Sequence, residues 1–491
     1  MSSKLMRSTI STSFVWNFGA VVFRRVINVI AIPVIARLVS KEDYGNIQII
    51  ISTFMLLAVI RNSGFNDYYI KEADNRGEKF FSMFVNTMYL NTFVLAAIFI
   101  PALGIYRYFN DVSSTYTYLI LIIVLLLINV GEIAGETYFR QKVLFKNIAI
   151  ASSIKIFSYP LFTIIFLLIR ADLFSLFAAF ALSIVAEIIS YFFFLPDSKV
   201  FLPDIKKMTE GFLLQFKERV FCFSVSAGMF ISNFNVSFPI YLFAYAFSAE
   251  HSARYAISAQ LVSMPFSLII DSLSKVIYPV FIKQNEEERR RFYLTMLKFF
   301  PFVLFPMALW IMIYAQDVVH LFLGEKWLDV APIIRIVSVP VFFNVLSSPL
   351  GPVATALGKP HYRVLWSGGS VLLALLLGSL GLQFGFLWGV AFVVLARVVT
   401  LIIWQVIACK MISLSHFKLV VQLSPYIPLW TMLAVLWMFF PEVSTYPYVR
   451  MFVAGTVGMI LYFLLFALFF KDDIVKIKKL INDLFKRKVF K

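Results

Sequence analysis

Long apolar runs separated by short polar segments dominate the chain. A helix that crosses a bilayer needs about 20 mostly apolar residues. Fourteen stretches satisfy this requirement: 14–36, 45–63, 82–103, 116–135, 149–169, 173–195, 220–247, 255–281, 299–320, 331–357, 364–383, 386–408, 420–440 and 448–470. Lipid offers backbone groups no hydrogen-bond partners, so spanning segments of this kind must be helical. The pattern predicts an all-α integral membrane protein of about fourteen transmembrane helices.

Composition supports the same class. Hydrophobic residues make up 60% of the 491 positions and charged residues 14%, against about 25% charged residues in an ordinary soluble domain. A soluble fold could not bury this much apolar surface in one core. The two cysteines, Cys222 and Cys409, lie inside apolar runs, and the four histidines are widely scattered, so neither a disulfide framework nor a metal site is expected.

The net charge of +17 is explained by membrane topology, and nucleic acid is not an expected partner. With the N-terminus placed in the cytoplasm, 32 of the 44 Lys and Arg residues fall on the cytoplasmic side and seven on the other side. This asymmetry follows the positive-inside rule and predicts cytoplasmic N- and C-termini. The basic segment 471–491 alternates apolar and basic positions, which is typical of an amphipathic helix bound to anionic lipids.

Two halves of the chain resemble each other at a spacing of about 210 residues. Ser40-Lys41-Glu42 follows the first predicted helix and Ser248-Ala249-Glu250 follows the seventh, and charged loops ending in two aromatic residues recur further on. The repeat predicts two six-helix lobes related by an axis along the membrane normal, with a substrate path between them. The expected parts are 1–195 (N-lobe), 196–219 (cytoplasmic linker), 220–408 (C-lobe), 409–470 (two further helices) and 471–491 (tail).

Five short motifs resemble those of Wzx-type polysaccharide flippases and occur in the family's order. They are IARLVSKEDYG (35–45), YFRQKVLFK (138–146), SKVIYP (274–279), LGEKW (323–327) and ALGKP (356–360). On this resemblance the chain is identified as a member of this group, which belongs to the multidrug/oligosaccharidyl-lipid/polysaccharide exporter superfamily.

The resemblance implies both a fold and a function. The fold would be two MATE-like bundles around a central cavity. The function would be to flip an undecaprenyl-diphosphate-linked oligosaccharide repeat unit to the periplasmic leaflet of the bacterial inner membrane, for O-antigen or exopolysaccharide biosynthesis. A polysaccharide polymerase and a chain-length regulator are the partners that it implies, and a monomer is expected.

Charged side chains inside the membrane cost about 2.5–3.5 kcal/mol each on insertion scales and so need a reason. Arg24, Arg25, Lys275 and Arg397 fall within predicted helices. One interpretation is that they make the cavity cationic and bind the diphosphate, which suits the bidentate geometry of Arg. The other is local neutralisation, of Lys275 by Asp271 and of Arg397 by backbone carbonyls.

Buried acids are candidates for coupling transport to H⁺ or Na⁺. Glu132, Glu187 and Asp271 are the candidates. A second interpretation of Glu132, together with Glu136, is that it only balances the nearby Arg140 and Lys142. No phosphate-binding loop occurs, so neither ATP nor another cofactor is expected.

Three other functions fit parts of the pattern. A membrane polysaccharide polymerase or ligase would need a large outward loop with paired acids or bases, whereas the outward loops are short. A multidrug or organic-cation exporter would favour an acidic or aromatic cavity, whereas the deep charges are net basic. A lipid scramblase or assembly scaffold stays open on sequence grounds.

Overall fold

The computed structural model describes residues 19, 23, 26–27, 29–77, 79–109, 115–195, 203–283, 286–347, 354, 361–440, 447–471 and 473. The side chains of some helical residues, among them 267–283, lie outside this description. Every regular element within these ranges is helical. The chain divides into two compact units, Met1–Ala253 and Arg254–Lys491.

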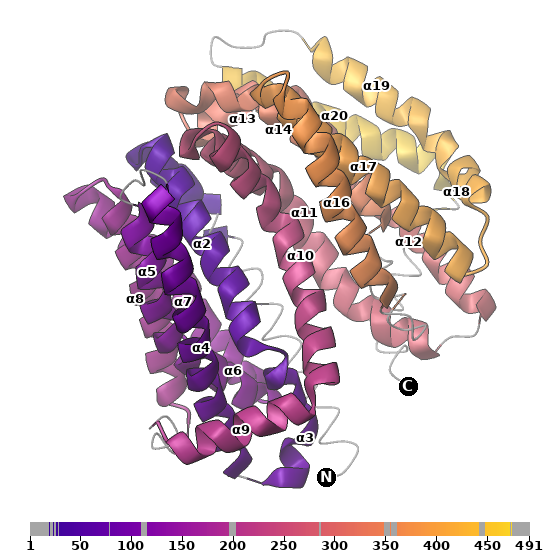
Figure 1. Ribbon diagram of the computed structural model, residues 1–491. Helices are drawn as coiled ribbons and strands as arrows, with labels where there is room; N and C mark the ends of the chain where they lie inside the picture. Colours follow the sequence, from indigo (N-terminus) through magenta and orange to yellow (C-terminus); the bar gives the residue numbers. More distant parts are fainter. Residues whose placement is uncertain are drawn as a thin grey trace. The chain divides into compact units, whose positions relative to one another are not determined.

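Unit 1 begins with a short apolar helix, Val29–Leu38, and continues as a bundle (Figure 1). Its helices are α2 (Lys41–Asn62), α3 (Phe65–Arg76), α4 (Lys79–Phe109), α5 (Thr115–Ile128), α6 (Val130–Gln141), α7 (Phe145–Ile169), α8 (Leu173–Phe192), α9 (Ile205–Lys217) and α10 (Arg219–Ala246). Helix α9 lies across one end of this bundle and packs against α4.

Unit 2 contains the rest of the described helices. Helix α11 (Ala249–Lys283) starts in unit 1 and continues into unit 2. The others are α12 (Glu286–Ile313), α13 (Ala315–Phe322), the 3₁₀ turn Glu325–Val330, α14 (Ala331–Ser347), α16 (His361–Leu382), α17 (Phe386–Met411), α18 (His416–Leu423), the 3₁₀ turn Ser424–Tyr426, α19 (Ile427–Met438) and α20 (Pro447–Phe469).

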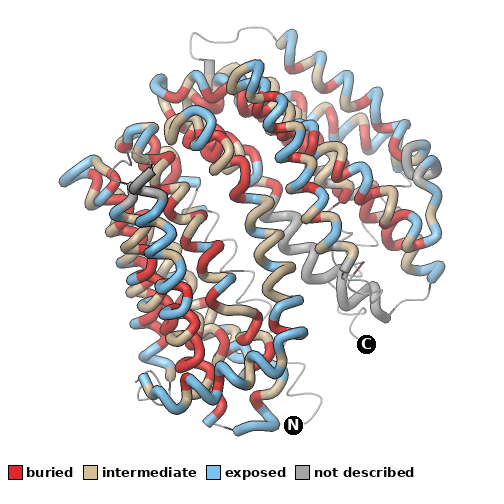
Figure 2. The backbone as a smooth tube through the Cα atoms, viewed as in Figure 1, coloured by how far each residue is buried: buried red, intermediate tan, exposed pale blue. Residues whose placement is uncertain are grey.

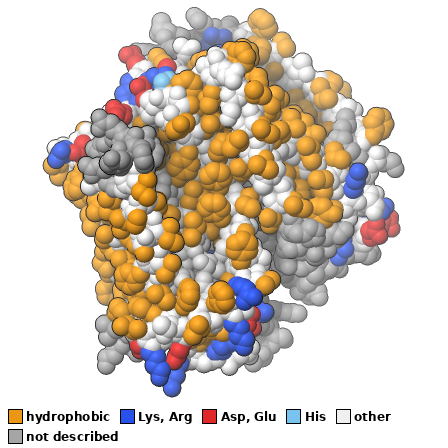
Figure 3. All heavy atoms as spheres, viewed as in Figure 1, with side chains coloured by type: hydrophobic (Ala, Val, Ile, Leu, Met, Phe, Trp, Pro, Cys, Tyr) orange, Lys and Arg blue, Asp and Glu red, His pale blue; other side chains and the backbone are white. Residues whose placement is uncertain are grey.

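Apolar side chains cover the outside of the helices, while polar side chains are buried. Helix α7 exposes Ile154, Phe157, Leu161, Ile165 and Leu168 along one face, whereas Ser158 and Thr163 on the same helix are buried (Figure 2). Hydrophobic atoms also dominate the surface seen in Figure 3. This inverted arrangement is expected where lipid, and not water, surrounds the helices.

Twelve helices in the described part of the chain are long and apolar enough to cross a membrane. They correspond to twelve of the fourteen predicted stretches. The other two are 14–36, about half of which lies outside the described residues, and 255–281, within α11. The all-helical membrane fold is therefore confirmed. The count of fourteen, the domain boundaries and the amphipathic tail, nearly all of which lies outside the described residues, stay predictions.

The repeated Ser-x-Glu sequences have the same structural role in both places. Ser40 caps the start of α2, where its Oγ accepts a hydrogen bond from the backbone N–H of Asp43 at 3.0 Å. Ser248 precedes α11 in the same way, and its Oγ lies 3.4 Å from the backbone nitrogen of His251. A side-chain oxygen at this position satisfies an N–H group that the helix leaves unpaired.

The starts of α2 and α11 also touch each other within unit 1. A Cβ atom on Gly45 would lie 1.8 Å from the carbonyl oxygen of Ala249, so only glycine allows this approach. Beside it, the Lys41 ammonium lies 3.7 Å from the Glu250 carboxylate. The two related sequence motifs thus form one contact inside unit 1, between the starts of α2 and α11.

Candidate functional site

A buried ion network lies inside unit 1, and Arg61 near the end of α2 is its first member. The Arg61 side chain is 1% exposed. It donates hydrogen bonds to the backbone oxygen of Leu126 at 2.6 Å and to Oδ1 of Asn129 at 2.8 Å. Asn129, at the junction of α5 and α6, connects Arg61 to Glu132, because its Nδ2 donates to Oε2 of Glu132 at 2.8 Å.

Lys155 on α7 stands between two carboxylates at the centre of the network. Its Nζ lies 2.7 Å from Glu132 on α6 and 3.1 Å from Glu187 on α8. The Glu187 side chain is 6% exposed, and its other oxygen lies 3.5 Å from the hydroxyl of Tyr191. With both carboxylates ionised, Arg61 and Lys155 balance them, and protonation of either acid leaves one excess positive charge.

A close approach of α6 to α8 holds the two acids near each other. A Cβ atom on Gly135 would lie 2.5 Å from the ring of Tyr191, so the glycine lets the ring pack directly on the α6 backbone. Small residues commonly permit such contacts between membrane helices. Glu132 lies one turn before Gly135, and Glu187 one turn before Tyr191. The contact between α6 and α8 therefore brings the carboxylates of Glu132 and Glu187 within ion-pair distance of Lys155.

The sequence anticipated half of this network. Glu132 and Glu187 were candidates, and the structure brings them together. Glu136 pairs with Arg140 as one interpretation expected, whereas Glu132 pairs with Lys155. The 32 Lys and Arg residues assigned to the cytoplasmic side included Lys155 and Arg61, and that assignment is wrong for these two. Both lie within helices, Arg61 fully buried and the Lys155 side chain 23% exposed. The signal that could have found Lys155 is its place inside the stretch 149–169.

The predicted cationic cavity is not assembled among the described side chains. Arg397 lies on α17 with its side chain exposed, in unit 2. Lys275 and Asp271 lie on α11, but their side chains are outside the described residues, as are Arg24 and Arg25 altogether. The roles assigned to these five residues stay predictions.

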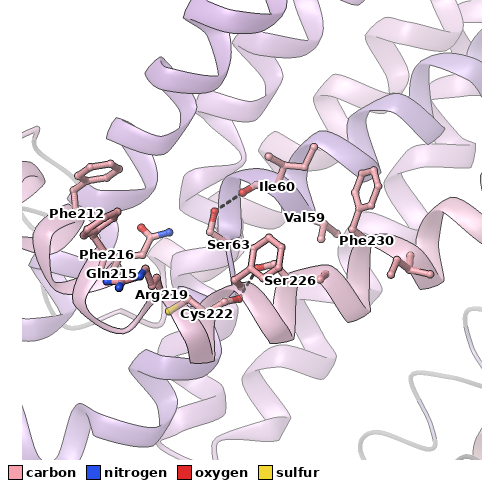
Figure 4. A pocket seen from close by; sticks show the side chains of 13 residues that line it. Val59, Ile60, Ser63, Phe212, Gln215, Phe216, Arg219, Cys222, Ser226 and Phe230 are labelled. Atoms are coloured by element: carbon pink, nitrogen blue, oxygen red, sulfur yellow. Dashed lines mark hydrogen bonds between the residues drawn. The ribbon is translucent and has the colours of Figure 1, made fainter. Parts of the chain in front are cut away.

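An apolar pocket of about 570 Å³ adjoins the network, between α2, α9 and α10 (Figure 4). Its polar side chains include Gln215 and Arg219, which lie close together in the close-up. Gln215 is joined to the network through Asn91 on α4. The Nδ2 of Asn91 donates both to Oε1 of Gln215 at 3.1 Å and to the backbone oxygen of Arg61 at 2.9 Å.

Metal ligands are not grouped in the part of the chain that the structure describes, where no cluster of three His, Cys, Asp or Glu side chains could hold an ion. Cys222 and Cys409 are buried, as expected.

These features define a multi-pass membrane protein whose helices bury charge and expose hydrocarbon. The chain belongs to the polysaccharide biosynthesis protein family, whose model matches residues 34–348, well over half of the sequence. The resemblance read from the short motifs is thereby confirmed at the level of the family.

Two relatives share a shorter stretch with the chain. The teichuronic acid biosynthesis protein TuaB of Bacillus subtilis (strain 168) is 30% identical over 147 residues, which is 30% of each protein. An uncharacterized membrane protein in the cps region of Klebsiella pneumoniae is 26% identical over 150 residues, which is 30% of this chain and 31% of the relative. The match thus spans less than a third of either relative's length.

Solved structures show the fold. The lipid II flippase MurJ, in an inward closed conformation, matches with a TM-score of 0.69 and 16% identity, over 93% of this chain and 99% of MurJ. A multidrug resistance MATE family transporter, facing inward, matches with a TM-score of 0.60 and 14% identity, over 79% of this chain and 94% of the transporter. The expected MATE-like fold is confirmed.

Proposed function

We propose that this protein flips a polyprenyl-diphosphate-linked oligosaccharide from the cytoplasmic to the periplasmic leaflet of the bacterial inner membrane by alternating access. Membership of the polysaccharide biosynthesis family carries the proposal, since a membrane protein in such a pathway must handle a glycan on a lipid carrier. The fold shared with a lipid II flippase and with MATE transporters supports transport, and not catalysis, as the activity. The N- and C-termini are cytoplasmic in this account.

The buried network supplies a means of coupling. Lys155 between two acids is costly in a membrane, and a purely structural role would be served as well by apolar side chains. Protonation of Glu132 or Glu187 would weaken one of the two ion pairs of Lys155 and loosen the contacts among α6, α7 and α8. Proton exchange at this carboxylate pair is therefore the proposed link to an ion gradient, with Na⁺ as the alternative ion and Asp271 as a further candidate.

The contact between the starts of α2 and α11 supports alternating access. It depends on Gly45, and the ion pair between Lys41 and Glu250 reinforces it. Such a contact can break and re-form without unfolding either helix. We place it at the periplasmic side, where it would close the pathway while the substrate is loaded from the cytoplasm.

A test in cells uses a strain that lacks this protein and has an intact glycan pathway. The lipid-linked repeat unit should accumulate on the cytoplasmic face and surface glycan should be lost, with both restored by the wild-type gene. A drug-sensitivity change with normal surface glycan would instead indicate the multidrug exporter. Loss of glycan polymerisation with normal flipping would indicate a polymerase or ligase.

A further inference from the structure

The pocket of unit 1 has apolar walls and a polar end. Val59 and Ile60 of α2, Phe212 of α9, and Phe223, Phe230 and Ile231 of α10 form the apolar part. Arg219 starts α10, and Ile231 lies twelve residues further on, which places them about 18 Å apart along the helix axis. The pocket is thus long enough for a stretch of hydrocarbon chain, and its volume lies in the usual range for a ligand site.

The polar end of the pocket presents hydrogen-bond donors in a fixed orientation. Asn91 is 8% exposed, and its Nδ2 faces the backbone oxygen of Arg61, which can only accept. The same Nδ2 therefore meets the oxygen of the Gln215 carboxamide, and not its nitrogen. This fixes the orientation of Gln215 and leaves the two N–H groups of its Nε2 without a recorded partner in the described part of the chain.

Arg219 adds a positive charge beside Gln215. Its guanidinium lies 5.1 Å from the centre of the Phe216 ring. Within the described part of the chain its one hydrogen bond is long, at 3.4 Å to the backbone oxygen of Phe216. The remaining N–H groups can meet an incoming anion. A guanidinium and an amide that both donate fit the oxygens of a phosphate.

We propose that this pocket binds the prenyl chain of a lipid phosphate, with the phosphate against Arg219 and Gln215. Charge complementarity selects an anionic amphiphile, and one elongated pocket takes one chain, whereas a glycerophospholipid brings two. The identity of the lipid as a prenyl phosphate rests on the proposed function. Asn91 is a positioning residue, which acts by holding Gln215.

The site also touches the ion network. Asn91 binds the backbone of Arg61 and the side chain of Gln215 at once. A phosphate bound to Gln215 would therefore act on Asn91, which also contacts the backbone of Arg61. Arg61 is connected through Asn129 and Glu132 to Lys155 and Glu187. Binding in the pocket can thus affect the proposed coupling site through Asn91 and Arg61.

Photolabelling of the full-length protein in phosphatidylcholine nanodiscs tests the site, with a geranylgeranyl monophosphate that carries a diazirine on its chain as the probe. Label should appear in peptides that contain residues 212–216 and 223–231. Unlabelled geranylgeranyl phosphate should compete, while geranylgeraniol, inorganic phosphate and phosphatidylglycerol should each compete at least tenfold less well.

Three variants sharpen the test. Ala227→Trp, which fills the pocket, should abolish labelling of these peptides. Arg219→Gln and Asn91→Leu should weaken probe binding by about tenfold, whereas Lys217→Gln, which removes a neighbouring exposed charge outside the pocket, should leave it unchanged. Thermal melting of each variant checks that it is folded.

Several results would overturn the proposal. Equal competition by phosphatidylglycerol would mean ordinary lipid contact. Labelling that survives Ala227→Trp, or that falls equally in Arg219→Gln and Lys217→Gln, would mean no specific site. A pocket that stays unlabelled and whose cysteine replacements cross-link to residues 14–36 would mean that the chain's own first predicted helix fills it. Normal glycan flipping by Ala227→Trp would contradict a role for the pocket and leave the proposed function standing. Specific labelling of a protein that flips no glycan would support the pocket and contradict the proposed function.

Discussion

Removal of the Lys155 ammonium is the perturbation with the clearest consequence. Lys155→Met leaves the carboxylates of Glu132 and Glu187 facing each other without the cation that lies 2.7 Å from one and 3.1 Å from the other. At an effective dielectric constant of 20, a unit ion pair at about 3 Å is worth roughly 5 kcal/mol. Breaking a buried pair from one side typically costs about 3–5 kcal/mol, because a charge is left uncompensated.

The expected result is a marked loss of thermal stability in Lys155→Met, measured as the melting temperature of the purified protein in nanodiscs. Lys142→Met is the matched control, since Lys142 is an exposed lysine just after α6, and it should melt like the wild type. The triple variant Lys155→Met, Glu132→Gln, Glu187→Gln removes all three charges at nearly constant volume. It should recover part of the lost stability, because no carboxylates are left facing each other. Arg61 keeps its hydrogen bonds to the Leu126 oxygen and to Asn129 but loses its acidic counter-ion, so recovery should be incomplete.

The triple variant separates a structural network from a coupling network. If the ions only hold α6, α7 and α8 together, a neutral set that restores folding also restores transport. If they carry the coupling, the folded triple variant no longer responds to an ion gradient. A triple variant with wild-type gradient-driven flipping would refute the assignment of coupling to these carboxylates, and an unchanged melting temperature in Lys155→Met would refute the energetic reasoning itself.

Other predictions concern the two close contacts and the core of unit 2. Gly45→Val should force the starts of α2 and α11 apart by at least ~1.5 Å, since its Cβ would otherwise lie 1.8 Å from the Ala249 oxygen where ordinary contact begins at 3.4 Å. In a protein without Cys222 and Cys409, a short bifunctional thiol reagent should join cysteines at positions 41 and 250 several-fold less well in Gly45→Val than in its Gly45 parent; equal yields would contradict the proposed closure. Gly135→Leu should lower the melting temperature by separating α6 from α8, and retention of wild-type stability and flipping would show that their approach is dispensable. Trp437→Ala should destabilise by about 3–5 kcal/mol, because Trp437 is fully buried and donates to the Ala454 oxygen at 2.8 Å; flipping per folded molecule should stay normal, and a specific transport defect would be unexpected.

The membrane fold could be predicted because its signal is local. Each spanning helix is a run of about 20 apolar residues, and the N-cap at Ser40 sits in a motif of adjacent residues. These features depend on the neighbouring residues alone, so they can be recognised from the sequence without a structure.

The ion network could be predicted only in part because it depends on pairing across helices. Glu132 and Glu187 stood out as acids in apolar surroundings, but Lys155 meets them 23 and 32 positions away along the chain. A hydropathy window reports a lysine near a helix end as a loop charge, and it cannot show which helix faces it. The pocket was missed for the same reason: Ser63, Gln215 and Arg219 come together only when α2, α9 and α10 pack.

The central claim is tested most directly by a flipping measurement in proteoliposomes. The purified protein would be reconstituted with a fluorescent oligosaccharide on polyprenyl diphosphate, and a membrane-impermeant quencher would report how much of the glycan reaches the outside after an inward-directed proton or sodium gradient is imposed. The account predicts flipping that needs the gradient, that is lost in the folded triple variant of Lys155, Glu132 and Glu187, and that persists in Lys142→Met. Absence of flipping by the folded wild-type protein under either gradient would contradict it.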